Sequence, residues 1–431
     1  MKKYVSLVLF SLLSWAVCAK DFPKVILAGD YPDPTILRDG KDYYMTHSPF
    51  YYAPGFLIWH SQDLEHWEPV CRAMAQWEGS AMAPDLVKYN NRYYIYYPAA
   101  GTNWVIWADD IRGPWSAPKD LKVSGIDPGH VADADGKRYL YLSEGKVVQL
   151  SDDGLSTVGE VRKVYDGWPY PRNWRTEGMY LESPKLNYHN GYYYLTSAEG
   201  GTAGPGTSHM VVTARSKSVL GPWENSPFNP LVHTYSERES WWSKGHGTLI
   251  DDVNGNWWVV YHAYAKGYHT LGRQTLIEPI EWTPDGWCRA KSTGTFPKAE
   301  VPIRHGLELS DDFQGTELGL QWTFWKEYAP KAVTLENRTL RLKAKGKTPA
   351  DGRLLLATAE DKNYETQVEV TVGKNNTAGL LLYYSEKAYA GLVSDGKTFT
   401  VYRHAGQKTE LPNTLGRQFT VRIKNQGNHV S

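Results

Sequence analysis

Cysteine is scarce in this sequence. Only three cysteines occur among 431 residues, at positions 18, 71 and 288, and no two of them form a C-x-x-C pair. So few thiols exclude a disulfide framework. Cys71 and Cys288 could pair or could sit buried as free thiols. We expect them to be buried, because a chain of this length can build a core that needs no covalent cross-link.

Net charge is also lacking. The chain carries 47 basic and 47 acidic residues. A nucleic-acid-binding protein, or one that binds an anionic membrane surface, usually has a basic excess. We therefore expect neither nucleic acid nor an anionic membrane among its partners.

Long apolar runs are absent beyond the first twenty residues. Lys2 and Lys3 precede an apolar run from Tyr4 to Val17, and small residues follow at the end of the run. This is the pattern of an export signal, and the run is too short for a membrane anchor. We predict a signal peptide over residues 1–19 with cleavage after Ala19. Cys18 raises the alternative of lipid attachment, but Val17 is bulkier than such sites usually allow. The mature protein is expected to be exported, periplasmic or secreted, with no membrane insertion.

Aromatic residues with a polar handle are abundant. The chain has 18 Trp and 30 Tyr but only 10 Phe. Such side chains pack edge to face in β-proteins and also stack on sugar rings. Most of them are expected to do no more than fill sheets.

A turn followed by an aromatic strand recurs five times along the chain. The copies are DGKDYYMTHS, NNRYYIYYPA, DGKRYLYLSE, HNGYYYLTSA and NGNWWVVYHA. Glycine or asparagine before alternating β-formers indicates a hairpin. The second turn residues, Gly40, Asn91, Gly136, Gly191 and Gly255, lie 45 to 64 residues apart.

Repeats of this length with almost no helical periodicity are typical of β-propeller blades. Three copies are followed by a second repeated segment that contains a tryptophan: SQDLEHWEPV, DDIRGPWSAP and KSVLGPWENSP. The sequence therefore predicts an all-β fold with a five-bladed β-propeller over residues 20–303. A β-sandwich with coincidental hairpins fits the recurrent tryptophan less well.

The pattern changes after residue 303. Alternating strands such as TLRLKAKG and ETQVEVTVG follow, and they predict a second all-β domain, a sandwich, over residues 304–431. Because the last segment stops within a strand-and-turn pattern, we expect this domain to be incomplete.

The repeat also predicts which side chains share a site. The innermost strand of each blade should precede the hairpin turn. Counting back nine residues from three of the turns gives Asp127, Glu182 and His246, and seven residues from the first turn gives Asp33. In the second repeat, Asp85 and Ala83 are equally good equivalents. Because the offsets differ by an even number, a strand of period two would turn these four side chains the same way.

Carboxylates that converge with aromatic side chains suggest glycoside hydrolysis. One carboxylic acid protonates the leaving oxygen, and a carboxylate activates water or attacks the anomeric carbon. A third carboxylate can raise the pKa of the acid by like-charge repulsion. Calcium alone is a weaker interpretation, since its oxygen ligands usually cluster in one loop and these residues come from four repeats.

At these residues the chain resembles glycoside hydrolase family 43, five-bladed propeller enzymes that cleave xylosides and arabinosides with inversion. DYPDPTIL resembles the segment with the general base, which implies that role for Asp33. GIDPGHVADADGKRYL resembles the segment with the pKa-modulating aspartate, here Asp127, and ESPKLNYHNGYYYL the one with the general acid, here Glu182.

Two further segments and the second domain extend the resemblance. GHGTLID implies an axial histidine, His246, which often binds a structural Ca²⁺ through waters. LGRQTLIEPIEWTPDGW implies a substrate-binding arginine, Arg273. No cofactor is required for the chemistry. The second domain resembles the concanavalin-like β-sandwich appended to family β-xylosidases, which can lend the active site a loop.

The chain departs from the family pattern at two places near the sugar. The acid motif commonly reads Glu-Gly-Pro-His and here reads Glu-Ser-Pro-Lys, with Lys185. The second-blade motif commonly has Trp where this chain has Met82. The resemblance implies exo-acting release of terminal xylosyl or arabinofuranosyl units from plant cell-wall oligosaccharides. Galactofuranosyl or galactosyl units, or a non-catalytic sugar-binding propeller, are the alternatives.

The remaining candidate residues concern the sugar and the rim. Glu177 lies five residues before Glu182 and fourteen before its turn, so we interpret it as a loop residue at the mouth of the pocket. Candidate stacking residues follow inner strands, and we expect two of the five to contact substrate: Phe50, Tyr52, Trp77, Trp104 and Trp168.

Overall fold

A computed structural model describes residues 22–404 and 406–431. Its regular structure is β-strand apart from three 3₁₀ turns in the described residues: η1 (Ser143–Gly145), η2 (His269–Leu271) and η3 (Pro330–Ala332). The all-β prediction is confirmed. The predicted export signal, residues 1–19, lies outside the described residues. In the part of the chain that is described, no helix is long and apolar enough to cross a membrane.

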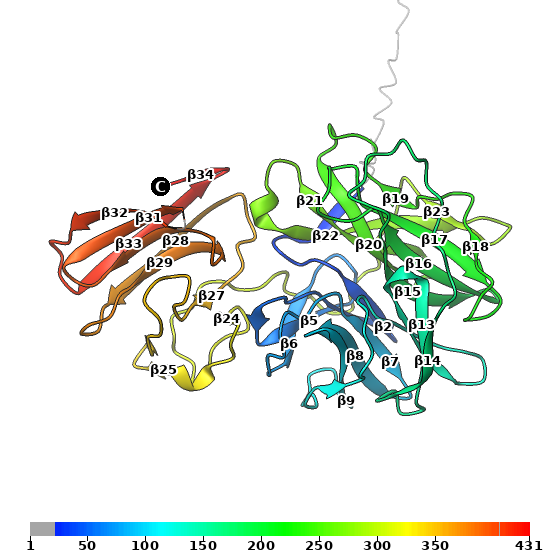
Figure 1. Cartoon of the computed structure of the whole chain (residues 1–431), viewed down its shortest axis with the longest axis horizontal. Helices are drawn as coiled ribbons and strands as arrows, with labels where there is room; N and C mark the ends of the chain where they lie inside the picture. Colours follow the sequence, from blue (N-terminus) through cyan, green and yellow to red (C-terminus); the bar gives the residue numbers. More distant parts are fainter. Residues whose placement is uncertain (1–21, 405) are drawn as a thin grey trace, which may run out of the picture.

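Five antiparallel sheets follow one another along the chain, one for each predicted repeat (Figure 1). The first contains β2 (Thr35–Asp39), β3 (Asp42–Thr46), β5 (Gly55–Ser61) and β6 (Glu68–Met74), and the second contains β7 (Asp85–Tyr89), β8 (Arg92–Ala99), β9 (Thr102–Ala108) and β10 (Lys119–Asp120). The third contains β11 (Gly129–Ala132), β12 (Arg138–Leu142), β13 (Lys146–Leu150) and β14 (Thr157–Lys163).

The last two sheets have an extra strand each. The fourth contains β15 (Leu181–His189), β16 (Tyr192–Glu199), β17 (Met210–Ser216), β18 (Glu224–Asn225) and β19 (Val232–His233). The fifth contains β20 (Trp241–Asp251), β21 (Trp257–Ala265), β22 (Arg273–Trp282), β23 (Cys288–Ala290) and β1 (Lys24–Leu27). These sheets are the blades of the predicted five-bladed propeller, and the first strand of each blade is its innermost.

The five turn residues found in the sequence connect the first and second strands of the five blades. All five have a positive φ: 65° at Gly40, 60° at Asn91, 80° at Gly136, 81° at Gly191 and 78° at Gly255. Glycine and asparagine adopt this conformation at the lowest cost. The repeated turn chemistry therefore has a direct structural cause.

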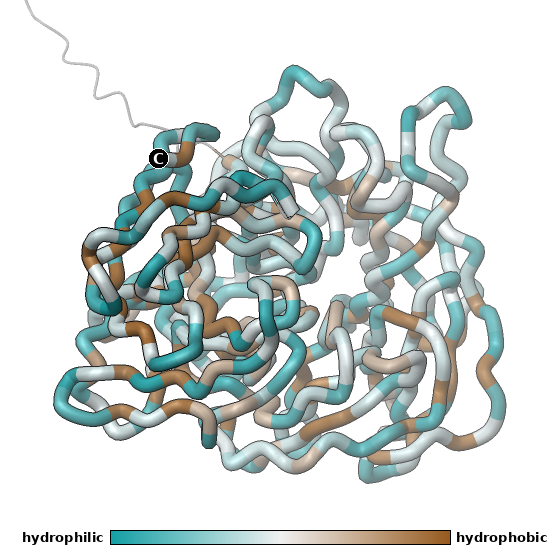
Figure 2. The backbone as a smooth tube through the Cα atoms, turned by 60° about the vertical axis from the view of Figure 1, so that its left-hand side comes forward, coloured by the Kyte–Doolittle hydropathy of each residue, from teal (hydrophilic) through white to brown (hydrophobic). Residues whose placement is uncertain are grey.

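The first strand of the chain closes the ring. β1 pairs with β22, so the fifth blade takes its outer strand from the N-terminal end of the propeller. Ile26 and Leu27 are buried there in a core cluster that also holds Ile36 of the first blade and Ile277 of the fifth. Such clusters fill the spaces between blades, and in Figure 2 hydrophobic segments alternate with hydrophilic ones along the chain.

Both cysteines outside residues 1–21 are free thiols. Cys288 is buried, as expected, but Cys71 is only half-buried, with its Sγ beside the carbonyl of Ile111. The expectation of burial thus holds fully for one thiol and partly for the other.

The C-terminal domain is a β-sandwich, which lies beside the propeller (yellow to red in Figure 1). One sheet contains β28 (Asn363–Thr371), β33 (Gln418–Gln426) and β34 (His429–Val430), and the other β29 (Ala378–Ser385), β30 (Ala388–Ser394), β31 (Thr398–His404) and β32 (Gln407–Pro412). A smaller hairpin contains β25 (Val333–Glu336) and β26 (Thr339–Leu342). Val372, Phe419 and Val421 form the buried centre of this domain.

Backbone hydrogen bonds join the second domain to the first blade. β24 (Thr323–Trp325) pairs on one side with β27 (Leu355–Leu356) and on the other with β4 (Tyr52–Ala53), a short strand of the propeller. The Tyr31 hydroxyl also donates to Glu360 Oε1 across 3.0 Å. The two domains therefore share a sheet and a side-chain contact two residues from Asp33.

Candidate active site

A repeated backbone feature lies just before the inner strand in the first three blades and within it in the last two. In four blades a residue with positive φ precedes a proline: Asp33 (φ 56°), Ala83 (38°), Asp127 (54°) and Ser183 (56°), and in the fifth His246 (56°) precedes Gly247. Proline cannot donate a ladder hydrogen bond, which suits a strand start or a bulge. The site is thus built on five matching irregular positions rather than on regular strands.

This alignment corrects the spacing argument made from the sequence. Strand alternation does not apply at residues with positive φ, and Ser183 rather than Glu182 occupies the place of Asp33 and Asp127. The count was displaced because the hairpins of the third and fifth blades are longer, with Ala132 paired to Arg138 and Asp251 paired to Trp257. In the second blade the equivalent residue is Ala83. Glu182 precedes the repeated position by one residue.

Asp33 is a buried carboxylate held in its ionised form. Arg273 Nη1 donates to its Oδ1 across 2.7 Å, and Ser48 Oγ donates to its Oδ2 across 2.5 Å. Nδ1 of His246 and of His262 lie 3.4 and 3.2 Å from Oδ1. Burial opposes ionisation, but Arg273 and the two histidines outweigh it and hold the pKa of Asp33 well below its usual range.

Asp127 is buried without a comparable cation. Its Oδ2 accepts the backbone N–H of Ser183 across 3.0 Å. Burial, followed by the negative charge of Asp33, raises the pKa of Asp127, and the Ser183 N–H, Lys185 and Arg273 offset part of that effect. Asp127 is therefore a carboxyl group that ionises reluctantly.

Glu182 lies on β15 with its side chain 19% exposed, so it is the most accessible of the three carboxyl groups. Burial raises its pKa, and the charges of Asp127, Asp33 and Glu177 raise it further, while Arg273 acts in the opposite direction. His209 Nε2 lies 3.7 Å from Glu182 Oε1. One carboxylate that is ionised beside one carboxyl that stays protonated can accept and donate a proton at the same pH.

The remaining predicted polar residues fall into two groups. Arg273, on β22, and His246, on β20, contact Asp33 directly. Glu177 is exposed in the loop before β15, and its Oε2 accepts the N–H of Ala203 across 2.7 Å. Its influence on the pKa of Glu182 agrees with a position at the mouth of the site.

The five predicted stacking residues do not gather at one place. Phe50 is half-buried with its ring 5.6 Å from the guanidinium of Arg273, which places it beside the carboxylates. Tyr52 packs against Trp325 of the second domain, and Trp104 lies within β9 rather than in a loop, with Nε1 bonded to Ala99.

The last two stacking candidates lie in loops. Trp77 precedes β7, is half-buried, and its indole nitrogen has no hydrogen-bond partner among the described residues. Trp168 is fixed by its backbone N–H, which donates to Glu199 Oε1 across 2.6 Å, and its ring packs on Tyr170 and Trp174.

Sequence reasoning missed three residues of the site. His209 is 1% exposed and neither ring nitrogen has a hydrogen-bond partner among the described residues. His262 accepts the backbone N–H of Asp33, and Ser48 links Asp33 to the N–H of Ala83. None belongs to the inner-strand repeat, so spacing could not find them; the tertiary fold alone brings them to the axis.

A metal ion could use the group of Asp33, His246 and His262, whose ligand atoms lie within 4.8 Å of one another. One carboxylate and two imidazoles are a poor match for Ca²⁺, which prefers six to eight oxygens. Arg273 also occupies the same carboxylate oxygen. His246 Nε2 is buried without a partner among the described residues, and this atom suits contact with a water molecule.

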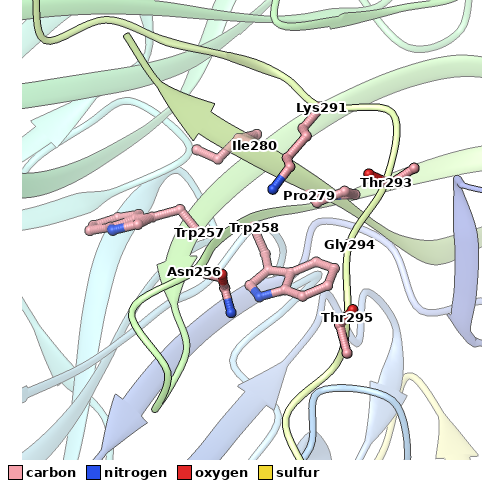
Figure 3. Close-up of a pocket in the computed structure, with 9 residues that line it drawn as sticks. All are labelled: Asn256, Trp257, Trp258, Pro279, Ile280, Lys291, Thr293, Gly294 and Thr295. Carbon is pink, nitrogen blue, oxygen red and sulfur yellow. The ribbon is translucent and has the colours of Figure 1, made fainter. Parts of the chain in front are cut away.

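A separate cavity of about 170 Å³ lies against β21 and β22 (Figure 3). Trp258, Pro279, Lys291 and Thr295 are among its lining residues, and no lining residue is a carboxylate. It therefore lacks the acid–base pair that the axial site contains.

Comparisons with known proteins agree with this geometry. The family model of glycosyl hydrolases family 43 matches residues 22–288, and that of the beta xylosidase C-terminal concanavalin A-like domain matches residues 310–427. A non-reducing end alpha-L-arabinofuranosidase of Bacteroides ovatus is 31% identical over 380 residues, covering 80% of this chain and 70% of that protein. A xylan 1,3-beta-xylosidase of a Vibrio species is 30% identical, covering 84% and 77%.

Solved structures give the same result. The chain superposes on a xylan beta-1,4-xylosidase of Bacillus halodurans with a TM-score of 0.83 at 28% identity, covering 95% of this chain and 88% of that one. The relatives are thus all of one kind. They agree with the buried carboxyl groups at the propeller axis and with the second domain. The chain belongs to glycosyl hydrolases family 43 and is a glycoside hydrolase.

Proposed function

We propose that this enzyme is an exo-acting, inverting hydrolase that releases terminal xylosyl or arabinofuranosyl units from plant cell-wall oligosaccharides. The observation that carries the proposal is the opposite shift of two carboxyl pKa values in one site, downward at Asp33 and upward at Glu182. The relatives named for β-xylosidase and α-L-arabinofuranosidase activity support the choice of sugar.

In this mechanism Glu182 is the general acid and Asp33 the general base. Glu182 transfers its proton to the glycosidic oxygen as the bond from that oxygen to the anomeric carbon breaks. A water molecule attacks the anomeric carbon from the opposite face and gives a proton to Asp33. Return of that proton through solvent to Glu182 restores both groups.

Asp127 and Arg273 support these roles from either side. Burial, followed by the charge of Asp127, raises the pKa of Glu182 and so keeps the acid protonated. Arg273 forms a two-point contact with Asp33, at 2.7 and 3.4 Å, which orients the base and keeps it ionised. Phe50, beside Arg273, is the stacking candidate that this arrangement favours for the sugar.

Replacing the acid tests the proposal. Glu182→Gln is expected to lower kcat on unactivated xylo- and arabino-oligosaccharides by about 10²–10⁴-fold, the usual contribution of general acid catalysis. Aryl glycosides with a good leaving group need less protonation and should lose much less. Steady-state rates on both substrate types measure this, and an equal loss on both would exclude an acid role.

The sugar and the stereochemistry need separate measurements. Product analysis on arabinoxylan, arabinan and galactan identifies the sugar unit released. Release of galactose only would show that the enzyme acts on galactosyl units rather than on a pentose. Proton NMR of the first product anomer reports inversion or retention, and retention would contradict a water-activating role for Asp33.

We propose export after cleavage at Ala19, which N-terminal sequencing of the mature protein tests. We also propose that a Ca²⁺ ion on the axis contacts His246 only through water. Adding calcium to chelator-treated enzyme should then raise the Tm measured by thermal unfolding. An unchanged Tm would contradict the proposed Ca²⁺ site.

A further inference from the structure

Lys185 is a buried lysine at the centre of the propeller. It lies on β15, and its side chain is 3% exposed. Its ammonium donates to three oxygens: the carbonyl of Pro84 at 2.8 Å, Oδ1 of Asp85 at 2.9 Å and the carbonyl of Pro128 at 3.2 Å. An ammonium has three donors, so all of them are used. Lys185 therefore has no donor left for a substrate.

The partners of Lys185 lie at the inner strands of the second and third blades. Lys185 is the second residue after the positive-φ position of its blade, and Thr35, Asp85 and Gly129 hold the same place in theirs. These residues form a layer directly beneath the carboxyl groups of the site. Asp85 is the common acceptor of this layer. Besides Lys185, Thr35 Oγ1 (3.3 Å) and the backbone N–H of His130 (2.7 Å) donate to its carboxylate.

This layer fixes the strands that carry Asp127 and Glu182. Pro128 follows Asp127 directly, so the bond from Lys185 to its carbonyl anchors the backbone at that aspartate. Glu182 lies three residues before Lys185 on the same strand. Asp127 in turn accepts the N–H of Ser183, and both of these residues have a positive φ.

The charge of Lys185 also reaches the site. It opposes the burial that raises the pKa of Asp127. Removing the ammonium alone would leave Asp85 as an uncompensated buried anion, which is costly. A test must therefore separate the loss of charge from the loss of the anchor.

We propose that Lys185 is a positioning residue that holds Asp127 in register with Glu182 by tying the second, third and fourth blades together beneath the active site. This inference rests on the proposed roles of Asp127 and Glu182. It assigns a purpose to the lysine that replaces the histidine common in the family motif.

Two variants separate the loss of the hydrogen bonds of Lys185 from the loss of its positive charge. Lys185→Met with Asp85→Asn removes both charges and keeps the volume, so the protein should fold. Its kcat on an aryl xyloside or arabinofuranoside should fall about 100-fold, the effect of a misplacement of about 1 Å, with a small change in KM. Lys185→Met alone should also shift the alkaline limb of the kcat/KM profile to higher pH, because the positive charge that lowers the pKa of Asp127, the partner of Glu182 in this limb, is lost.

The control is Lys244→Met, which removes another buried lysine whose Nζ donates to Glu239 Oε2 at 3.0 Å and to none of the three carboxyl groups of the site. It should lower Tm while kcat and the pH profile stay as in the parent. If the double variant keeps kcat within threefold of the parent, or loses activity only in proportion to unfolded protein, the proposal is overturned.

Crystal structures of the parent and the double variant provide a readout that needs no substrate. The hydrogen bond from Ser183 N to Asp127 should be broken or lengthened in the variant; an unchanged bond contradicts positioning by Lys185. If the parent releases no pentose but Asp127 still moves in the variant, the proposed function is contradicted. The structural role of Lys185 would then still hold.

Discussion

At the residue scale, the chemistry depends on neighbours rather than on residue type. Asp33 and Asp127 have the same side chain, similar burial and the same backbone conformation. Arg273 lies against Asp33 and keeps its pKa low, whereas Asp127 forms no ion pair within the described part of the chain and its pKa is raised. In the proposed mechanism, one guanidinium therefore decides which of the two aspartates serves as the base.

The pH dependence of activity follows from these directions. In the proposed mechanism Asp33 must be ionised, and its lowered pKa keeps it so at pH values below the usual titration range of an aspartate. Glu182 must be protonated, and its raised pKa keeps it so until the pH rises well above the usual range of a carboxyl group. The alkaline limb of kcat/KM should therefore report the pair of Glu182 and Asp127, and the acid limb should lie low.

Glu177 gives a direct test of this electrostatic picture. Its negative charge raises the pKa of Glu182, so Glu177→Gln should move the alkaline limb of kcat/KM to lower pH. A solvent-screened interaction of about 0.5 kcal/mol corresponds to about 0.4 pH unit. Glu160→Gln, at an exposed position of β14, is the matched control and should leave the limb in place. A limb that moves upward would contradict the assignment.

At the scale of single elements, the inner strands approach one another very closely. A Cβ added to Gly129 on β11 would lie 1.8 Å from the carbonyl oxygen of Pro184 on β15. Only a residue without a side chain fits there. This glycine lets the strands after Asp127 and Glu182 meet without a spacer.

Gly129→Ala should consequently separate the two strands. We expect a loss of about 1–3 kcal/mol in the free energy of unfolding, as for other overpacked sites, together with a loss of kcat in the fraction that stays folded. Urea unfolding and active-site-normalised rates measure the two effects. Gly315→Ala is the control, since its added Cβ would come no closer than 3.2 Å to another atom. Unchanged stability in the Gly129 variant would show that the strands can move apart freely.

At the scale of the whole molecule, the second domain is docked through a shared sheet. Trp325 on β24 pairs with Tyr52, contacts its ring at 5.3 Å, and donates its indole N–H to Glu386 across 2.9 Å. Tyr52, a stacking candidate in the sequence, therefore serves this interface. The second domain also contacts Tyr31, two residues from Asp33, because Glu360 accepts the hydrogen bond of the Tyr31 hydroxyl.

Trp325→Ala should weaken this docking. We expect unfolding of the two domains to become less cooperative and the lower transition to fall by several degrees, because a large aromatic contact is lost. Differential scanning calorimetry of the full chain is the measurement, with Leu411→Ala, at a half-exposed position of β32, as the control. A single transition at the parent temperature would mean that Trp325 contributes little to the interface.

The sequence by itself determined the repeat and the residue types. Five turns with Gly or Asn predicted five hairpins because those residues adopt a positive φ, and Asp33, Asp127 and Glu182 were found from their distance to these turns. The three carboxyl groups do interact in the structure. The premise of regular strands was nevertheless wrong, because the positions with positive φ are irregular and Ser183 rather than Glu182 matches Asp33.

Only the tertiary structure decided which groups touch. His209, His262 and Ser48 lie outside the inner-strand repeat, and Trp104 and Tyr52 pack elsewhere than at the carboxylates. The spacing of residues along one blade says nothing about the neighbouring blade. The pKa values, and with them the assignment of acid and base, depend on charges that meet across blades, because electrostatic interactions follow distance in space and not separation in sequence.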